Sequence, residues 1–234
     1  MKRFLKRLLR RADEPTRTER LFNVLSSLGL KPDHIVDVGA NHGDWTRAAL
    51  AAFPLARVTM FEPQKHLSTK HADLAGNNRV KVCYQGVGDF DGSAAFTFHP
   101  RDDSSSFVYS APAAAAQGFV QSDVEICRLD TVMTKSKFGM PEIVKIDAEG
   151  LDLKVLNGAP ETLASADIVL IEATVSCPEY PNTAAIVFSR MEMEGFRLFD
   201  ITDLNRMPNG TLWLIEAVFV RIGCSVDLAS QVYR

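Results

Sequence analysis

Acidic side chains stand at the ends of several apolar runs that the sequence predicts to be strands. Asp37, Glu62, Asp147 and Glu172 each lie at or directly after the end of such a run. Ligands of open α/β sheets bind outside the carboxyl ends of the strands, so we expect these carboxylates along one rim of a sheet. Carboxylates accept hydrogen bonds from ammonium and hydroxyl groups. The pattern therefore predicts a binding site for a ligand that carries such donors.

A glycine-bearing turn follows the first of these strands, in the stretch HIVDVGANHGDWT at 34–46. Gly39 and Gly43 have no Cβ to keep a ligand away from the backbone, and Asn41 between them tolerates left-handed backbone. The helix that begins near Asp44 adds unpaired N–H groups at its N-terminus. The spacing D-x-G-x-N-x-G differs from the G-x-G-x-x-G of dinucleotide-binding folds, which disfavours an NAD-dependent oxidoreductase.

Two of the acids fit one small molecule. A carboxylate at Asp37 is unfavourable next to a pyrophosphate but suits an ammonium group, and Glu62 can accept two hydrogen bonds from ribose hydroxyls. S-adenosylmethionine carries both groups, and we expect it as the cofactor. The alternative interpretation is a plain strand-to-helix turn with an incidental acid.

Composition predicts an ordinary globular protein. The chain has 234 residues, 46% of them hydrophobic, and a net charge of −3, which provides no general attraction for nucleic acid. Four cysteines lie far apart without a CxxC pair, which disfavours a zinc site and indicates reduced thiols in a cytoplasmic setting. No apolar run reaches the roughly 18 residues that a membrane-spanning helix needs.

Residues 1–30 are predicted to form a helical extension with a basic amphipathic start. The first eleven residues, MKRFLKRLLRR, carry six basic side chains, with Phe4, Leu5, Leu8 and Leu9 at helical spacing. One interpretation is a solvated helix that caps the domain. The other is peripheral contact with an anionic membrane at its inner face.

Residues 31–222 alternate between predicted strands and helices, which indicates a parallel sheet with right-handed crossovers. A β insertion is expected at about 90–130, and its segment 101–118 is predicted to be an irregular loop that acts as a lid on the substrate side. The last strand, 212–220, is expected to be antiparallel at the sheet edge. The predicted helices are 16–28, 44–53, 64–75, 151–156 and 183–194.

The segments VDVGANHGDWT, FEP at 61–63 and EIVKIDAEGLDLKVLNGA at 142–159 resemble the FkbM family of S-adenosylmethionine-dependent methyltransferases over about residues 35–220. The resemblance implies an α/β class I methyltransferase (Rossmann-like) fold, with a seven-stranded, mostly parallel sheet, helices on both faces and an antiparallel edge strand. It implies O-methylation of a hydroxyl on a sugar, glycolipid or related secondary-metabolite acceptor. The residues expected to hold the cofactor are Asp37, Gly39, Asn41 and Gly43 for the methionine part, Glu62 for the ribose, and Gly86 with Val87 beside the adenine.

Methyl transfer to a hydroxyl requires that the oxygen be aligned and its proton removed or delocalised. Asp147 is our first choice for contact with the acceptor. Lys145 lies on the same face of the strand, where it could keep Asp147 ionised, and Glu149 follows as a further catalytic candidate or as a helix cap. His99 and His66 are the next candidates for a base.

A metal site is a further hypothesis. If their strands are neighbours, Asp147 and Glu172 converge with Glu149, and a hard cation such as Mg²⁺ would relieve the repulsion between the carboxylates. Against it, Lys145 could neutralise Asp147 without an ion.

The leading alternative to an enzyme is a cofactor-binding protein without chemistry, or a scaffold at the membrane surface. The net charge of −3 disfavours nucleic acid as the substrate. No oligomeric state follows from the sequence.

Overall fold

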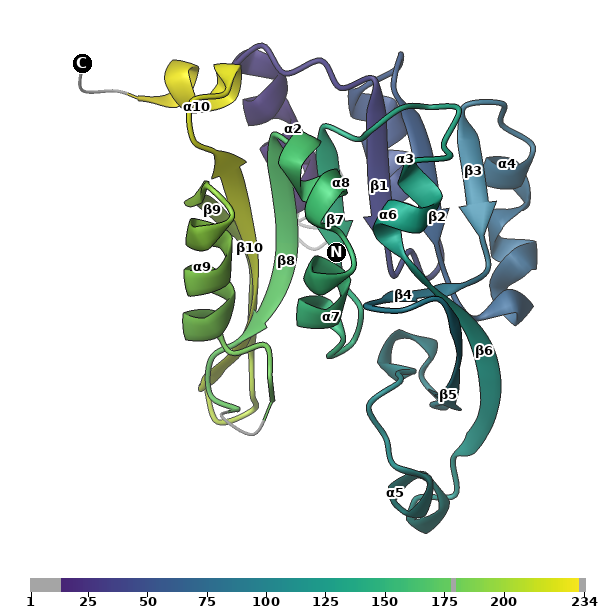
Figure 1. Ribbon diagram of the computed structural model, residues 1–234. Coiled ribbons are helices and arrows are strands. Elements are labelled where there is room, and N and C mark those ends of the chain that lie inside the picture. Colours follow the sequence, from purple (N-terminus) through teal and green to yellow (C-terminus); the bar gives the residue numbers. More distant parts are fainter. Residues whose placement is uncertain (1–13, 178–179, 232–234) are drawn as a thin grey trace, which may run out of the picture.

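A seven-stranded sheet forms the centre of the molecule, with strand order β3-β2-β1-β7-β8-β10-β9 (Figure 1). The computed structural model describes residues 14–177 and 180–231. The strands are β1 (His34–Val38), β2 (Arg57–Phe61), β3 (Val80–Cys83), β7 (Ile143–Ile146), β8 (Ile168–Thr174), β9 (Phe196–Arg206) and β10 (Leu212–Arg221).

The pairing directions confirm the predicted sheet. β3, β2, β1, β7 and β8 pair in parallel, whereas β10 is antiparallel to both β8 and β9. The antiparallel strand therefore lies one position inside the edge, because β9 is outermost. The strand β9 extends well beyond its apolar start at 196–199, since polar residues on it continue the pairing with β10.

Helices cover both faces of the sheet (Figure 1). The helices α2 (Arg17–Ser27), α3 (Asp44–Ala52) and α10 (Ser225–Ser230) contribute to one apolar cluster, together with Ile35 of β1 and Leu170 of β8. The cluster on the other face is built from α6 (Leu129–Met133), α7 (Asp152–Asn157), α8 (Pro160–Ser165) and α9 (Ala184–Met193).

Local sequence explains several of the helix boundaries. Thr16 caps α2 in a capping box with Glu19, which satisfies two backbone N–H groups at the helix start. The predicted helix at 64–75 is a 3₁₀ segment, η1 (Lys65–His71), followed by a short α4 (Ala72–Ala75). The basic segment at the chain start lies outside the described residues, so its predicted membrane contact stays a prediction. None of the described helices combines the length and the apolar character required to cross a bilayer.

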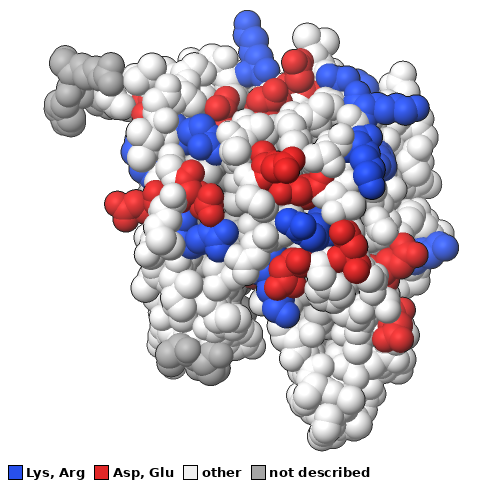
Figure 2. Space-filling model, viewed as in Figure 1, with Lys and Arg blue, Asp and Glu red and all other residues white. Residues whose placement is uncertain are grey.

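The insertion forms a second, three-stranded sheet below the carboxyl ends of β1 and β2 (Figure 1). Its strands are β4 (Gly86–Gly88), β5 (Gly92–Phe98) and β6 (Val120–Arg128), and β5 and β6 are antiparallel. The segment predicted to be irregular carries two short helices, η2 (Asp102–Ser104) and α5 (Ala111–Ala116). Residues 104–122 contain no charged side chain, and this projection is largely white in Figure 2.

Candidate active site

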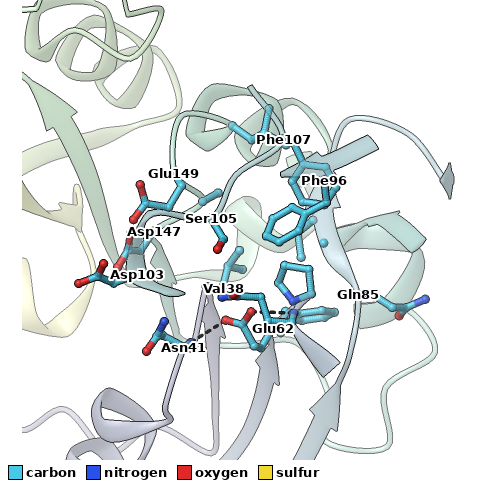
Figure 3. A pocket seen from close by; sticks show the side chains of 18 of the residues that line it. Val38, Asn41, Glu62, Gln85, Phe96, Asp103, Ser105, Phe107, Asp147 and Glu149 are labelled. Atoms are coloured by element: carbon cyan, nitrogen blue, oxygen red, sulfur yellow. Dashed lines mark hydrogen bonds between the residues drawn. The ribbon is translucent and has the colours of Figure 1, made fainter. Parts of the chain in front are cut away.

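A cavity with about 590 Å³ of empty volume, solvent at its mouth included, lies at the carboxyl ends of β1, β2 and β7 (Figure 3). The main sheet and its turns contribute Val38, Gly39, Asn41, Phe61, Glu62, Pro63, Gln64, Gln85, Asp147, Ala148, Glu149 and Leu151. The second sheet and its loop contribute Gly86, Val87, Phe96, Asp102, Asp103, Ser105 and Phe107.

The turn after β1 adopts left-handed backbone at Gly39 (φ 75°), Asn41 (φ 44°) and Gly43 (φ 84°). A Cβ on Gly39 would stand 1.8 Å from the backbone oxygen of Asp147. From the sequence, we expected Gly39 to lack a side chain in order to leave room for a ligand. In the structure, the atoms nearest to the missing side chain belong to Asp147, directly after β7. Asn41 and Gly39 line the cavity, whereas Gly43 lies outside its wall and caps α3.

Glu62 connects the ends of β1 and β2. One carboxylate oxygen accepts a hydrogen bond from the backbone N–H of Asn41 (2.7 Å), and the other accepts one from the backbone N–H of Gln64 (2.8 Å; Figure 3). Burial raises the pKa of Glu62, although these two hydrogen bonds act in the opposite direction. Because the side chain is on the cavity wall, it lies where a ribose contact requires it, and that contact stays a prediction.

Asp37 lies behind the cavity wall rather than on it. Its side chain is fully buried, and one oxygen accepts a hydrogen bond from the Thr46 hydroxyl (2.6 Å). The other oxygen, Oδ1, lies 3.6 Å from Lys145 Nζ and has no hydrogen-bond partner. A buried carboxylate in this position cannot touch a ligand, so the expected direct contact with the methionine ammonium is corrected.

Lys145 links this buried acid to the cavity. Its ammonium group donates to Asp147 Oδ2 at 3.0 Å, and Asp147 lies on the cavity wall. Burial alone would lower the pKa of Lys145, but the carboxylates of Asp147 and Asp37 more than offset this and raise it. Lys145 is therefore charged and buried beside its two partners. The spacing along the strand predicted only that it shares a face with Asp147, and its role in catalysis stays a prediction.

Glu149 lines the cavity from a left-handed backbone position (φ 48°), and no hydrogen bond joins its side chain to the described residues. The residue as a whole is exposed, yet burial of its carboxyl group and the negative charges of Asp147 and Asp152 raise its pKa to about 8. Glu149 does not cap a helix, contrary to one of the sequence interpretations.

Asp152 is the residue that holds this turn, and the sequence did not reveal it. Its buried carboxylate accepts hydrogen bonds from the backbone N–H groups of Ala148 (3.1 Å) and Gly150 (3.2 Å). It also accepts one from the Asn182 side chain (3.0 Å), which comes from the segment after β8. The position of Asp152, four residues after Ala148, could have indicated the local hydrogen bond. No sequence pattern indicates the contact with Asn182, which is thirty positions away.

The remaining acids do not form a metal centre. Glu172 lies on β8 directly opposite Glu216 of β10 and is not on the cavity wall. Burial and the charge of Asp147 raise the pKa of Glu172. Within residues 14–177 and 180–231, no group of three or more histidine, cysteine or acidic side chains is arranged to hold an ion. The predicted pair of Asp147 and Glu172 as Mg²⁺ ligands is therefore not supported.

Aromatic side chains from the insertion form the apolar end of the cavity. Gly86 and Val87 line it, and their contact with the adenine stays a prediction. The ring of Phe107 lies so close that a Cβ on Gly86 would be 2.5 Å from it. Phe96 packs edge-on against Phe107 at 4.6 Å between ring centroids. The sequence missed Phe107 because the segment around it has no helical or strand periodicity. Phe96 lies on β5, and the alternation of that strand does not show which cavity its side chains line.

The two histidines considered as bases lie elsewhere. His66 contacts Phe98 and His99 contacts Phe119, and neither lines the cavity. His42, which had no predicted role, pairs with Asp102 (2.7 Å).

The strand order, with one antiparallel strand next to the edge, defines the class I methyltransferase fold, and the cavity occupies the ligand-binding rim of such a sheet. Residues 37–198 match the methyltransferase FkbM domain, and the chain belongs to this family of S-adenosylmethionine-dependent methyltransferases. The predicted fold, family and enzyme class are confirmed.

Individual proteins show how close the similarity is. The chain is 25% identical over 174 residues to the 2-O-methyltransferase NoeI of Sinorhizobium fredii, covering 68% of this chain and 71% of NoeI. The solved methyltransferase FkbM from Methylobacillus flagellatus KT is 15% identical with a TM-score of 0.49, over 79% of this chain. The match covers 43% of that chain, so the present chain spans less than half of its length. An uncharacterized protein from Listeria monocytogenes serotype 4b has a TM-score of 0.52 at 12% identity, covering 91% and 70% of the two chains, and supports the fold alone.

Proposed function

We propose that this enzyme transfers a methyl group to a hydroxyl of a sugar, a glycolipid or a related acceptor. The observation that carries the proposal is the pair of carboxylates, Asp147 and Glu149, on the cavity wall. Glu62 and the rings of Phe96 and Phe107 line the same cavity. The relative named as a 2-O-methyltransferase supports an oxygen acceptor.

The cavity has the groups that S-adenosylmethionine requires. Glu62 offers carboxylate oxygens for ribose hydroxyls, and Phe96, Phe107 and Val87 provide apolar surface for a flat base. When bound, S-adenosylmethionine supplies a methyl group on a positively charged sulfur. The protein must then align the acceptor oxygen with that group and exclude competing water.

Two carboxylates with different protonation behaviour could divide the remaining work. Asp147, paired with the charged Lys145, is suited to orient an acceptor hydroxyl as a hydrogen-bond acceptor. Glu149, which has no hydrogen-bond partner in the described part of the chain and a pKa of about 8, is suited to receive the proton that the hydroxyl loses. We therefore assign Asp147 to orientation and Glu149 to general base catalysis, with Lys145 acting through Asp147.

Transfer of radiolabelled methyl from S-adenosylmethionine to a panel of sugar nucleotides, free glycosides and glycolipid precursors tests this function. We expect labelled product with at least one hydroxyl acceptor, and loss of labelling in Asp147→Asn while S-adenosylhomocysteine still binds. The matched control is Asp123→Asn, which removes an exposed carboxylate on β6. Cofactor binding without methyl transfer to any acceptor would instead support the alternative, a cofactor-binding protein without catalytic activity.

A further inference from the structure

A segment of the insertion passes across the cofactor cavity. Residues 102–108, here called the strap, contribute four of the residues on the cavity wall. The strap is tied to β5 by paired backbone hydrogen bonds between Thr97 and Ser106 (2.8 and 3.1 Å). It therefore has a defined place relative to the sheet, although it has little regular structure.

The strap contacts the segments that follow β1 and β2. The Asp102 backbone carbonyl accepts a hydrogen bond from the Gln64 side chain (2.9 Å), and the Asp102 carboxylate pairs with His42 Nε2 (2.7 Å). At the other end of the strap, Phe107 packs on Gly86 after β3. These contacts bring the carboxylate of Asp102 to the turn between Gly39 and Gly43, where the amino-acid part of the cofactor is expected.

The structure leaves the amino-acid end of the cofactor without the anion that the sequence assigned to it. Asp37 is fully buried and lies next to Lys145, so its charge is compensated inside the sheet. Asp147 is also paired with Lys145. Because the proposed function already assigns Asp147 to the acceptor hydroxyl, an ammonium group at the turn after β1 calls for a further carboxylate that is partly open to the cavity.

We propose that Asp102 of the strap is the acidic contact for the α-ammonium group of S-adenosylmethionine, and that His42 holds it in place. The inference rests on the proposed function, because it assigns a residue to that cofactor. The carboxylate is partly exposed and lines the cavity. The hydrogen bond from His42 lowers the pKa of Asp102, so the group is negatively charged at neutral pH.

Binding of two ligands that differ only in the amino-acid part tests this assignment. S-adenosylhomocysteine carries the α-ammonium group, and 5′-methylthioadenosine lacks the whole amino-acid part. In calorimetry with the full chain, Asp102→Asn is expected to lower the affinity for S-adenosylhomocysteine roughly tenfold or more, because a charge-assisted hydrogen bond is lost. Its affinity for 5′-methylthioadenosine is expected to stay within about twofold of the wild type, since that ligand never uses the contact.

Three further variants make the result specific. Asp123→Asn removes an exposed carboxylate elsewhere in the same insertion and should change neither affinity. Asp103→Asn removes the neighbouring acid, which pairs with the exposed Arg101, and should affect the two ligands equally if at all. His42→Leu should reproduce the selective loss of Asp102→Asn, whereas His42→Gln, which keeps a side-chain N–H donor, should restore most of the affinity.

The possible failures separate the two proposals. If the wild type binds neither ligand, the cofactor assignment is wrong and the role of Asp102 falls with it. If the wild type binds both ligands and Asp102→Asn binds S-adenosylhomocysteine as tightly as the wild type does, only the role of Asp102 is overturned. An equal loss of both ligands, or a selective loss in Asp103→Asn alone, also overturns it.

Discussion

Gly39 and Asp147 come from adjacent parallel strands and lie in such close contact that no side chain fits between them. An ideal Cβ on Gly39 would be 1.8 Å from the Asp147 backbone oxygen, and the residue also has a positive φ of 75°. The glycine therefore allows the turn after β1 to meet the turn that carries the two carboxylates proposed to act in catalysis. This contact joins the proposed cofactor side of the site to the proposed acceptor side.

Gly39→Ala is expected to destabilise the protein and to reduce cofactor binding. The matched control is Gly118→Ala in the insertion, where φ is 70° but nothing lies within 4 Å of the new Cβ. Left-handed backbone costs both variants about 1–2 kcal/mol. The clash should cost Gly39→Ala about a further 1–3 kcal/mol in free energy of unfolding, measured by urea denaturation. Equal losses in the two variants would show that the close approach does not exist.

Glu62→Ala is expected to lower the affinity for S-adenosylhomocysteine roughly tenfold or more, because a charged hydrogen-bond acceptor for the ribose is lost. The structure adds a second effect, since the backbone N–H groups of Asn41 and Gln64 lose their acceptor, and the melting temperature should fall as well. Glu125→Ala is the control, because that acid is exposed and bonds only to the Gln85 side chain. Calorimetry that finds unchanged affinity in Glu62→Ala would reject the ribose assignment.

Lys145→Met is expected to lower the free energy of unfolding by about 3–5 kcal/mol, because it leaves the buried Asp37 without a counter-charge. Methyl transfer should fall as well, since Asp147 loses the group that fixes its orientation. Lys154→Met on the exposed side of α7 makes the same chemical change without a buried partner and should alter neither property. A stable, active Lys145→Met variant would contradict the positioning role.

The pH dependence of methyl transfer should reflect the titration of the Glu149 carboxyl group. Its pKa is raised to about 8, so below that pH the carboxyl group is mostly protonated and cannot accept the proton of the acceptor hydroxyl. We expect kcat/KM to increase with pH up to about 8 and then to level off. Glu149→Gln should be slow at every pH, while the exposed Glu161→Gln keeps the wild-type profile. An unchanged profile in Glu149→Gln would assign the base to another group.

The sequence predicted the parts of this site that depend on local pattern. Short apolar runs with acids at their ends placed Glu62 and Asp147 on one rim, and the glycine spacing located the turn after β1. It did not predict that Asp37 would lie behind the cavity wall with its charge compensated, because the compensating group, Lys145, comes from a strand more than one hundred positions away. The strap was missed for the same kind of reason, since its position is set by contacts with His42 and Gln64 rather than by its own periodicity.

Binding of S-adenosylhomocysteine is expected to slow hydrogen exchange in the strap. The segment 101–118 was predicted to be a lid, and the structure places only its first part, residues 102–108, on the cavity wall. Amides near Asp102 and Phe107 should therefore become protected when ligand joins the strap to the sheet. The short helix α5 (Ala111–Ala116) and the buried strand β8 are internal controls, because neither touches the cavity, and their exchange should not change. Protection that is equal along the whole of 101–118 would indicate general ordering of the insertion, and equal exchange with and without ligand would show that the strap does not respond to the cofactor.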